Sequence, residues 1–597
     1  MSEYIAPVRD MQFVLKELAG LEQVAQLPGC EEATPDLVDA VLGEAARFAE
    51  EVLSPLNYPG DQEGARWHDK VVTMPAGFKE AYKLFVDSGW AALAAEPEWG
   101  GQGLPKVVSA AVSEMWKSAN HSFSLCPLLT AGAIEALVLR GSDELKATYL
   151  EKMVSGVWTG TMNLTEPNAG SDLAAVRTRA EPQADGSYRI YGQKIFITYG
   201  EHDMAENIVH LVLARTPDAP EGVKGISLFV VPKFLVNADG SLGARNDAYC
   251  VSIEHKLGIH ASPTAIIAFG DHTGAVGYLV GEENRGLEYM FIMMNAARFG
   301  VGLEGVAVCE RAYQRARDYA RERIQSTDVG VRGGPKVPII RHPDVRRMLM
   351  TMKAYAEATR ALAYVVAAAH DAAVHHPDVA TRKRNQAFVD LMIPVVKGWS
   401  TESGVVMASL GIQVHGGMGY VEETGAAQHL RDAQISTIYE GTTGIQANDL
   451  IGRKMAREGG STLKAVIAEM RAFAADIAGH ESTPLAAIRR RLTTAVDALE
   501  DAGDWLVATS GQDARAAAAG AVPFLKLLGI VAGGWQMARA ALVAQKRIDS
   551  GDSDPFYPTK VMTARFYADH VLSEAVAIAS SIVDGAEGVL ALPEDMF

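Results

Sequence analysis

The chain is poor in the residues that mark disulfide frameworks, metal centres and nucleic-acid surfaces. Its four cysteines lie far apart in 597 residues, without a Cys-x-x-Cys spacing, so neither disulfides nor zinc are indicated and a reducing compartment fits best. His370, His375 and His376 share an Ala- and Val-rich helix without a matching acidic ligand set, and no metal is expected. A formal net charge of −18 argues against nucleic acid as a partner.

Export and membrane signals are not found either. The opening Met1-Ser2-Glu3-Tyr4 does not combine a basic region with an apolar run, so we expect no signal peptide. The longest weakly polar stretch, Leu527–Ala538, is too short for a bilayer-spanning helix and is flanked by Lys526 and Arg539. The sequence therefore favours a cytoplasmic protein without a membrane partner.

What the chain does contain is an ordinary globular composition, with 48% hydrophobic and 21% charged residues. Apolar residues follow helical spacing from Thr34 to about residue 155 and again after the Gly281–Gly286 segment. Between them, from about residue 158 to 275, β-rich segments follow one another without helices. This order favours an antiparallel barrel or sandwich over a Rossmann unit.

Helical, then β, then helical periodicity predicts a mostly α protein with a central β domain. A break at Gly459-Gly460 separates a final Ala-rich segment. We expect an N-terminal helical extension (1–38), an N-terminal helical domain (39–157), a middle β domain (158–278), a helical bundle (279–460) and an extra C-terminal helical domain (461–597).

One carboxylate, Glu440, ends an apolar and aromatic segment that stops at Gly441. A carboxylate beside Ile438 and Tyr439 is costly to keep charged, so we expect the pKa of Glu440 to rise toward the range useful for a base. For an arbitrary glutamate, a solvated residue at the end of an element is the simpler interpretation.

Two earlier segments suggest a flat polar ligand. The loop Met162–Asp172 combines hydroxyls, small residues and backbone donors that can approach a heterocycle or a pyrophosphate, although a β-turn built from Pro, Asn and Gly would look the same. In the strand Gly192–Thr198, Phe196 and Thr198 are two positions apart and share one face. A half-buried strand is the alternative interpretation.

Taken together and in this order, these segments resemble the acyl-CoA dehydrogenase family over roughly residues 40–455. The loop is similar to the flavin-binding TEPxAGSD signature, which implies FAD contacts for Met162, Leu164, Thr165, Gly170 and Ser171, the last also near substrate. The strand resembles the family's K-x-W-I-T-N-G motif, with Phe196 in place of Trp and Tyr199 in place of Asn. The resemblance implies flavin contacts for Phe196 and Thr198, the latter near flavin N5.

Two further matches imply an FAD shared between subunits. Arg323 resembles the helix Arg that reaches the FAD of a neighbouring protomer, although Ser326-Thr327 stand where the family usually has Phe-Gly. Gln413–Tyr420 is similar to the family's QxxGGxGY segment, in which Gln413, Gly416 and Gly417 would cradle the FAD pyrophosphate and adenosine. The resemblance thus implies at least a homodimer.

Glu440 falls on the family's catalytic base, with Gly441 at the substrate and Thr442 against the flavin. Arg298 resembles a helix Arg near the substrate tail; a structural ion pair is its alternative. The implied reaction is FAD-dependent α,β-dehydrogenation of an acyl-CoA to the trans-2-enoyl-CoA, in which the base removes the α-proton and a β-hydride passes to the flavin. Electron-transfer flavoprotein is the expected acceptor.

The long form of the chain resembles the branch of the family that oxidises 3-methylmercaptopropionyl-CoA in dimethylsulfoniopropionate catabolism. A medium- or long-chain fatty acyl-CoA dehydrogenase and an acyl-CoA oxidase stay open as alternatives. An alkylation-response, DNA-associated flavoprotein is disfavoured, because residues 461–597 carry 12 Lys and Arg against 17 Asp and Glu, a net charge of −5.

Overall fold

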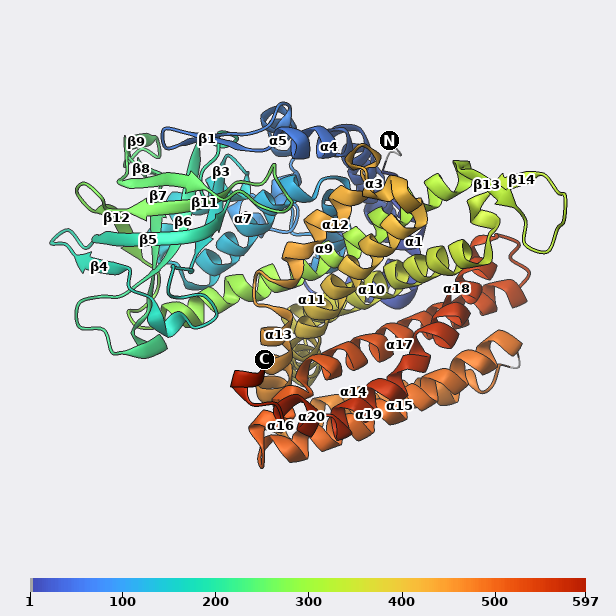
Figure 1. Cartoon of the computed structure of the whole chain (residues 1–597). Coiled ribbons are helices and arrows are strands. Elements are labelled where there is room, and N and C mark those ends of the chain that lie inside the picture. Colours follow the sequence, from blue (N-terminus) through green and yellow to red (C-terminus); the bar gives the residue numbers. More distant parts are fainter. Residues whose placement is uncertain (1–3, 481) are drawn as a thin grey trace. The chain divides into compact units, whose positions relative to one another are not determined.

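A computed structural model describes residues 4–480 and 482–597 of the chain (Figure 1). These residues divide into two compact units. The β unit consists of Phe48–Leu104 and Ala119–Gly300, and the helical unit of Met1–Arg47, Pro105–Ser118 and Val301–Phe597. The long helix α9 (Gly286–Glu322) contributes its first part to the β unit and its second part to the helical unit.

An eight-stranded sheet forms the centre of the β unit, in the order β10-β11-β5-β12-β7-β6-β3, with β4 paired to β5. Its neighbours are antiparallel except β3 and β6, which run parallel. This confirms a central β domain, with one parallel pair that the sequence did not indicate. The strands are β3 (Trp158–Asn163), β4 (Arg179–Pro182), β5 (Tyr188–Thr198), β6 (Asn207–Ala214), β7 (Ser227–Pro232), β10 (Ala248–Ile253), β11 (Thr264–Phe269) and β12 (Ala275–Leu279).

Three neighbouring strands at the β3 end of this order are buried along their whole length, polar residues included. Every residue of β3, β6 and β7 is buried, as expected for strands packed on two sides. The helices α7 (His121–Arg140) and α8 (Asp143–Val154) share a core with these strands that includes Leu137, Leu211 and Met290. Asn120 and Ser142 cap the two helices by accepting bonds from the N–H groups of Phe123 and Leu145.

Two hairpins interrupt regions for which the sequence pattern predicted only helices, and here the prediction was wrong. β1 (Arg66–His68) pairs with β2 (Val71–Thr73), and β13 (Ile324–Thr327) pairs with β14 (Lys336–Pro338). Asp69 and Lys70 join β1 to β2 with φ values of +45° and +69°. Consecutive positive φ angles form the tight turn that suits a hairpin, but Asp-Lys lacks the glycine that usually signals it. A further hairpin pairs β8 (Phe234–Val236) with β9 (Leu242–Arg245).

The helical unit is built around α10 (Pro343–His375) and α11 (Val379–His415), which pack along each other and against α17 (Ala521–Asp549). The C-terminal helices, orange to red in Figure 1, therefore continue the same core. The other helices of the two units are α1 (Val8–Phe13), α2 (Leu21–Val24), α3 (Pro35–Phe48), α4 (Ser54–Glu63), α5 (Phe78–Asp87), α6 (Lys106–Ala119), α12 (Ala426–Gln434), α13 (Thr443–Asp449), α14 (Ser461–Ile477), α15 (Thr483–Ser510), α16 (Ala514–Ala519), α18 (Phe556–His570), α19 (Ala575–Asp584) and α20 (Ala586–Leu590).

Three helices, α7, α9 and α17, are long and apolar enough to cross a membrane by length and composition. The expectation that Leu527–Ala538 is too short is thus wrong, because it is the middle of the 29-residue helix α17. In α17, however, 89% of the most apolar window is buried inside the protein. Its hydrophobicity is accounted for by core packing.

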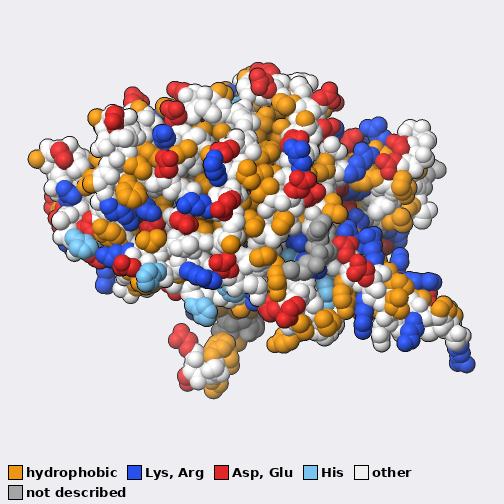
Figure 2. Space-filling model, turned by 90° about the horizontal axis from the view of Figure 1, so that it is seen from above, with side chains coloured by type: hydrophobic (Ala, Val, Ile, Leu, Met, Phe, Trp, Pro, Cys, Tyr) orange, Lys and Arg blue, Asp and Glu red, His pale blue; other side chains and the backbone are white. Residues whose placement is uncertain are grey.

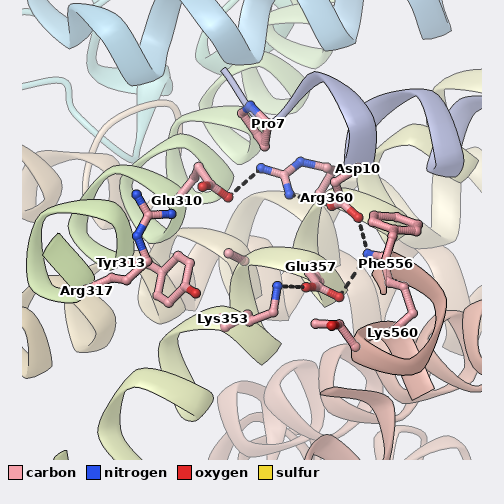
Figure 3. Close-up of a pocket in the computed structure, with 12 residues that line it drawn as sticks. Pro7, Asp10, Glu310, Tyr313, Arg317, Lys353, Glu357, Arg360, Phe556 and Lys560 are labelled. Carbon is pink, nitrogen blue, oxygen red and sulfur yellow. Dashed lines mark hydrogen bonds and ion pairs between the residues drawn. The ribbon is translucent and has the colours of Figure 1, made fainter. Parts of the chain in front are cut away.

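A buried ion network joins the two ends of the chain in the helical unit (Figure 3). Arg360 on α10 pairs with Glu114, Glu310 and Asp10 at 2.6, 2.8 and 2.8 Å. Lys560 on α18 lies between Asp10 and Glu357. Because Asp10 belongs to α1, the N-terminal extension and the C-terminal helices are held against the same helix, around a small cavity of about 160 Å³.

Candidate active site

Glu440 lies in a loop between α12 and α13 whose backbone is left-handed at two consecutive residues. The φ angles are +54° at Glu440 and +90° at Gly441. For a residue with a Cβ this conformation costs about 1–2 kcal/mol, so the surrounding structure must hold it. The φ of Gly441 favours glycine, and an added Cβ would lie 2.7 Å from Nε2 of Gln446, which would have to shift.

Two fully buried side chains bond to the carbonyl groups of this loop. Nε2 of Gln446 donates to the carbonyl oxygens of Glu440 and Gly441, at 3.1 and 3.3 Å. Nζ of Lys397 donates to the carbonyl oxygen of Gly441 at 2.7 Å. Both side chains are completely shielded from solvent, so the main chain around Glu440 is fixed from inside the helical unit.

The neighbouring Tyr439 is anchored through its side chain. Its hydroxyl donates to the carboxylate of Glu304 on α9, a fully buried residue. Burial, together with the charge of Glu304, raises the pKa of Tyr439 well above its usual range, so the phenol stays protonated. Lys117 is also buried nearby, and burial lowers the pKa of its ammonium although the charge of Glu304 opposes this effect.

Thr442, which the resemblance places against the flavin, begins the next helix. Its side chain accepts a bond from the N–H of Ile445 at 3.3 Å and so caps α13. The hydroxyl of Thr443 donates to the carboxylate of Glu402 at 2.5 Å. The residues on both sides of Glu440 are therefore tied to helices, while Glu440 itself is only half-buried.

In the β unit, the loop Met162–Asp172 is fastened to β5 by a buried ion pair. Nζ of Lys194 lies 2.8 Å from the carboxylate of Glu166 and 2.9 Å from the carbonyl oxygen of Leu164. Glu166 also accepts bonds from Thr178 and from the N–H of Arg177. Burial raises the pKa of Glu166, but Lys194 and these bonds outweigh it and the pKa lies below its usual value.

The predicted FAD contacts of this loop differ in exposure. Gly170 and Ser171 at its tip are exposed, Thr165 is half-buried, and Met162 and Leu164 are buried. An added Cβ at Gly170 would meet no atom within 4 Å. The loop thus presents a glycine, a hydroxyl and open backbone on a rigid base, while Met162 and Leu164 belong mainly to the core.

Phe196 lies at a bulge in β5, where the regular alternation assumed from the sequence is wrong. The pairing of β5 with β11 shifts by one residue between Ile197 and Lys194, and Phe196 has a φ of +59°. Its side chain is 58% exposed although it is large and apolar. Thr198, beyond the bulge, is half-buried, so its relation to Phe196 is set by the bulge and not by a shared strand face.

Tyr199, which stands where the family's strand motif has Asn, and His260 have structural contacts in the β unit. The hydroxyl of Tyr199 donates to the carbonyl oxygen of Ser122 at 2.7 Å. Nδ1 of His260 lies 2.9 Å from the carboxylate of Asp61 on α4. Arg298, predicted near the substrate, is buried near the end of the β unit's part of α9, with Nη1 3.5 Å from Oδ1 of Asn295.

The residues predicted to meet a neighbour's FAD are grouped at one end of the helical unit. The rings of Tyr319 on α9 and His415 on α11 stack at 4.3 Å. Arg323 lies one turn beyond Tyr319, and Gln413, Gly416 and Gly417 flank His415; all four are exposed. Added Cβ atoms at the two glycines would meet nothing within 4 Å, so this surface is open.

Models of known protein families match nearly the whole chain. The matching family models are described as "Acyl-CoA dehydrogenase, N-terminal domain" (38–157), "Acyl-CoA dehydrogenase, middle domain" (161–271), "Acyl-CoA dehydrogenase, C-terminal domain" (284–456) and "Acetyl-CoA dehydrogenase C-terminal like" (466–593). The chain belongs to the acyl-CoA dehydrogenase family. This confirms the family predicted from the sequence, and with it an FAD-dependent oxidoreductase acting on acyl-CoA.

Among curated relatives, a 3-methylmercaptopropionyl-CoA dehydrogenase of Ruegeria pomeroyi is 52% identical and covers 98% of this chain and 99% of that protein. A broad-specificity linear acyl-CoA dehydrogenase of Mycobacterium tuberculosis is 37% identical, with 96% of each chain covered. The fold is similar to that of Caenorhabditis elegans ACDH-11 in complex with C11-CoA, with a TM-score of 0.74 and 20% identity over 98% of this chain and 96% of the other. The mostly helical fold with a central sheet and an extra C-terminal domain is therefore confirmed.

The residues present in this acyl-CoA dehydrogenase fit FAD. A flavin needs hydroxyl and backbone partners beside an aromatic surface, and Thr165, Ser171, Thr198 and the exposed ring of Phe196 offer these chemical groups. No atom lies within 4 Å of where a Cβ would be at Gly170, so a ring or a phosphate can approach the backbone closely there.

Sequence reasoning missed the residues that hold these loops from behind. Glu166 and Lys194 lie inside the quoted motifs, and a lysine in the β-rich run Gly192–Thr198 was the one signal that a buried ion pair could be present. Lys397 and Glu304 lie in apolar helices, where a charged residue breaks the hydrophobic pattern. A charge at a position that the helical period assigns to the core indicates a specific buried partner.

Proposed function

We propose that this protein dehydrogenates 3-methylmercaptopropionyl-CoA to methylthioacryloyl-CoA. The observation that carries the proposal is the 52% identity to the Ruegeria pomeroyi enzyme over 98% of this chain. The match also runs through 99% of that relative, so it includes the N-terminal extension and the C-terminal helices. The proposal therefore covers the whole protein and not a shared module alone.

In the proposed reaction Glu440 is the catalytic base. Its carboxylate removes the proton from the α-carbon of the thioester, and the electron pair of that C–H bond forms the α,β double bond as hydride leaves the β-carbon. FAD, when bound, supplies the acceptor for this hydride. The left-handed backbone sets the direction of the Glu440 Cα–Cβ bond, and Lys397 and Gln446 hold the carbonyl groups of this backbone.

The remaining residues bind and orient. Thr165, Ser171 and Thr198 would hydrogen-bond the flavin, and Phe196 would cover one face of its ring system and exclude water. Met162, Leu164 and Gly170 shape the loop. Gly441 would allow the thioester to approach the backbone closely, and Arg298 would contact the polar part of the substrate.

A straight-chain acyl-CoA is the second candidate substrate. It is supported by the 37% identity to the broad-specificity linear acyl-CoA dehydrogenase, over 96% of each chain. The higher identity to the 3-methylmercaptopropionyl-CoA enzyme favours the sulfur-containing thioester.

Anaerobic bleaching of the protein-bound flavin tests the proposal. Purified holoenzyme is mixed with 3-methylmercaptopropionyl-CoA and, separately, with straight-chain acyl-CoAs from short to long. Fast bleaching by the sulfur thioester alone supports the first substrate, and equal bleaching by straight chains supports the second. Absence of bleaching by every thioester, with FAD present, would contradict dehydrogenation altogether.

We further propose a homodimer that shares FAD across its interface, in the cytoplasm, with electron-transfer flavoprotein as the acceptor. The open surface around Arg323, Gln413, Gly416 and Gly417 supports the dimer, and so does the adjacent Tyr420, 89% exposed. Sedimentation of the wild type and of Arg323→Ala, with FAD content measured in each, tests it. Peroxide formation with substrate in air would indicate an oxidase instead.

The DNA-associated alternative is not supported by the charge distribution. Over most of the face in Figure 2, acidic and basic side chains are interspersed with hydrophobic ones. The net charge of −5 for residues 461–597 gives phosphates little to bind. A salt-dependent DNA shift assay would detect such binding directly.

A further inference from the structure

The conformation of the Glu440 loop requires support that the reaction does not explain. Glu440 and Gly441 are consecutive left-handed residues, with φ angles of +54° and +90°. A residue with a Cβ returns to the right-handed region unless neighbouring groups hold its peptides. Because the backbone sets the direction of the Glu440 Cα–Cβ bond, the groups that hold these peptides also aim the carboxylate.

Two donors from different helices hold them. Gln446, on α13, bonds to the carbonyl oxygens of Glu440 and Gly441, and Lys397, on α11, bonds to that of Gly441 at 2.7 Å. Both side chains are fully buried. Burying an amide and an ammonium group is costly unless they are bonded, and losing either donor leaves a carbonyl oxygen of the loop with fewer partners.

A third contact fixes the residue before the base. The hydroxyl of Tyr439 donates to Glu304, which is fully buried on α9. The loop is therefore attached to three helices of the helical unit: by a side chain on one side of Glu440 and by main-chain carbonyls on the other.

We propose that Lys397 and Gln446 are positioning residues for the base, holding the carbonyls of Glu440 and Gly441 so that the Glu440 carboxylate points at the substrate α-carbon, with the Tyr439–Glu304 contact as a third anchor. This inference rests on the proposed function, in which Glu440 is the base. Misplacing a reacting group by 1 Å costs about 10²-fold in rate, so these residues act on turnover more than on binding.

The test replaces each donor by an apolar residue of similar size in the holoenzyme. For Gln446→Leu and Lys397→Met we expect kcat per bound FAD to fall about 10–100-fold while KM changes less than about threefold. Lys397→Arg retains a cationic donor and is expected to recover part of the lost kcat. If the two residues had a merely structural role, kcat would not fall selectively relative to KM, and Lys397→Arg would not recover it.

Matched controls come from buried residues of the same unit that do not touch the loop. Lys560 is a buried lysine in the ion network of α10 and α18. Gln314 is a buried glutamine whose Nε2 donates to a backbone carbonyl, that of Ile5, at 2.7 Å. Lys560→Met and Gln314→Leu should lower the melting temperature and leave kcat per bound FAD unchanged.

The positioning role is overturned if Lys397→Met and Gln446→Leu keep kcat within about twofold of wild type, or lose no more than their controls. If neither variant retains FAD, Tyr439→Phe decides, because it removes one oxygen atom; unchanged kcat then overturns the inference. Tyr364→Phe is its control, since the buried hydroxyl of Tyr364 donates to a carboxylate away from the loop, that of Glu114, at 2.7 Å. Full turnover by Glu440→Gln would instead remove the proposed function, whatever the loop variants do.

Discussion

The loop expected to bind the flavin and the loop that carries Glu440 are each held from behind by a fully buried lysine that donates to a main-chain carbonyl of the loop. Lys194 is paired in addition with a carboxylate of its own loop. Lys194 forms an ion pair with the Glu166 carboxylate at 2.8 Å. Lys397 donates to a main-chain carbonyl, that of Gly441, at 2.7 Å. Neither lysine is exposed to solvent.

The two loops differ in the ion pair and in the backbone conformation that each lysine holds. Lys194 balances the charge of Glu166 and also holds the carbonyl of Leu164, and the residues that follow form a short turn between Glu166 and Ala169. Lys397 holds the carbonyl directly after the left-handed Glu440, where the main chain must direct the base. The flavin loop requires a rigid support. The loop of Glu440 requires a main chain that points the carboxylate in one direction.

The largest effect on the rate is expected from removing the carboxylate of Glu440. Glu440→Gln keeps the size of the side chain but removes the base, so kcat should fall by about 10²–10⁴-fold with FAD content unchanged. Single-turnover flavin bleaching measures it. Thr165→Val in the other loop is the comparison: it should alter FAD affinity more than the rate. Equal losses of rate in both variants would break the distinction between the loops.

The next effect concerns stability. Lys194→Met leaves the Glu166 carboxylate buried without its partner, which costs about 3–5 kcal/mol. The variant should also lose FAD, because Lys194 holds the loop that is expected to bind it. For Lys397→Met we expect a smaller loss of about 1–3 kcal/mol, the cost of the lost hydrogen bond to the carbonyl oxygen of Gly441. Denaturant unfolding and flavin absorbance check both. A loss in Lys397→Met as large as that in Lys194→Met would contradict the comparison.

The ion pair also predicts a dependence on pH. The folded state holds the pKa of Glu166 below its usual value of 4.5, so its contribution to stability is complete above pH 4.5 and is lost as the pH falls through the folded pKa. Glu166→Gln should therefore destabilise the protein strongly at pH 7 and progressively less below pH 4.5. Unfolding free energies of both proteins between pH 7 and 3 measure the difference. A difference that stays constant with pH would show that the charge of Glu166 is not what stabilises this loop.

The smallest effect is expected at the bulge of β5. Phe196→Gly relieves a positive φ, so stability should change little or rise by up to about 1 kcal/mol, while FAD binds more weakly. Lys70→Gly, at a φ of +69° in the β1–β2 turn, is the control, with a similar change in stability and unaltered FAD binding. Unchanged FAD affinity in Phe196→Gly would argue against a ring contact.

The sequence predicted well where local patterns carry the information. The change of hydrophobic period from helical to alternating located the central sheet, and the helical spacing that begins at Thr34 matches the start of α3 at Pro35. The hairpin at Asp69-Lys70 was missed because its turn residues are unusual, and the bulge at Phe196 was missed because an extra residue leaves no mark in the alternation. The first depends on a turn without its usual glycine, and the second on pairing with β11, a strand distant in the chain.

The sequence by itself determined the family, the flavin-type loop and the identity of the candidate base, because these depend on which side chains follow one another. Only the tertiary structure decided that Glu440 is left-handed and that Lys397, Gln446 and Glu304 secure its loop. These residues lie between six and 136 positions from Glu440 in the chain. Their bonds exist only once the helices have packed. Spacing along the chain records the order of residues, whereas the direction of a backbone carbonyl is set by what folds against it.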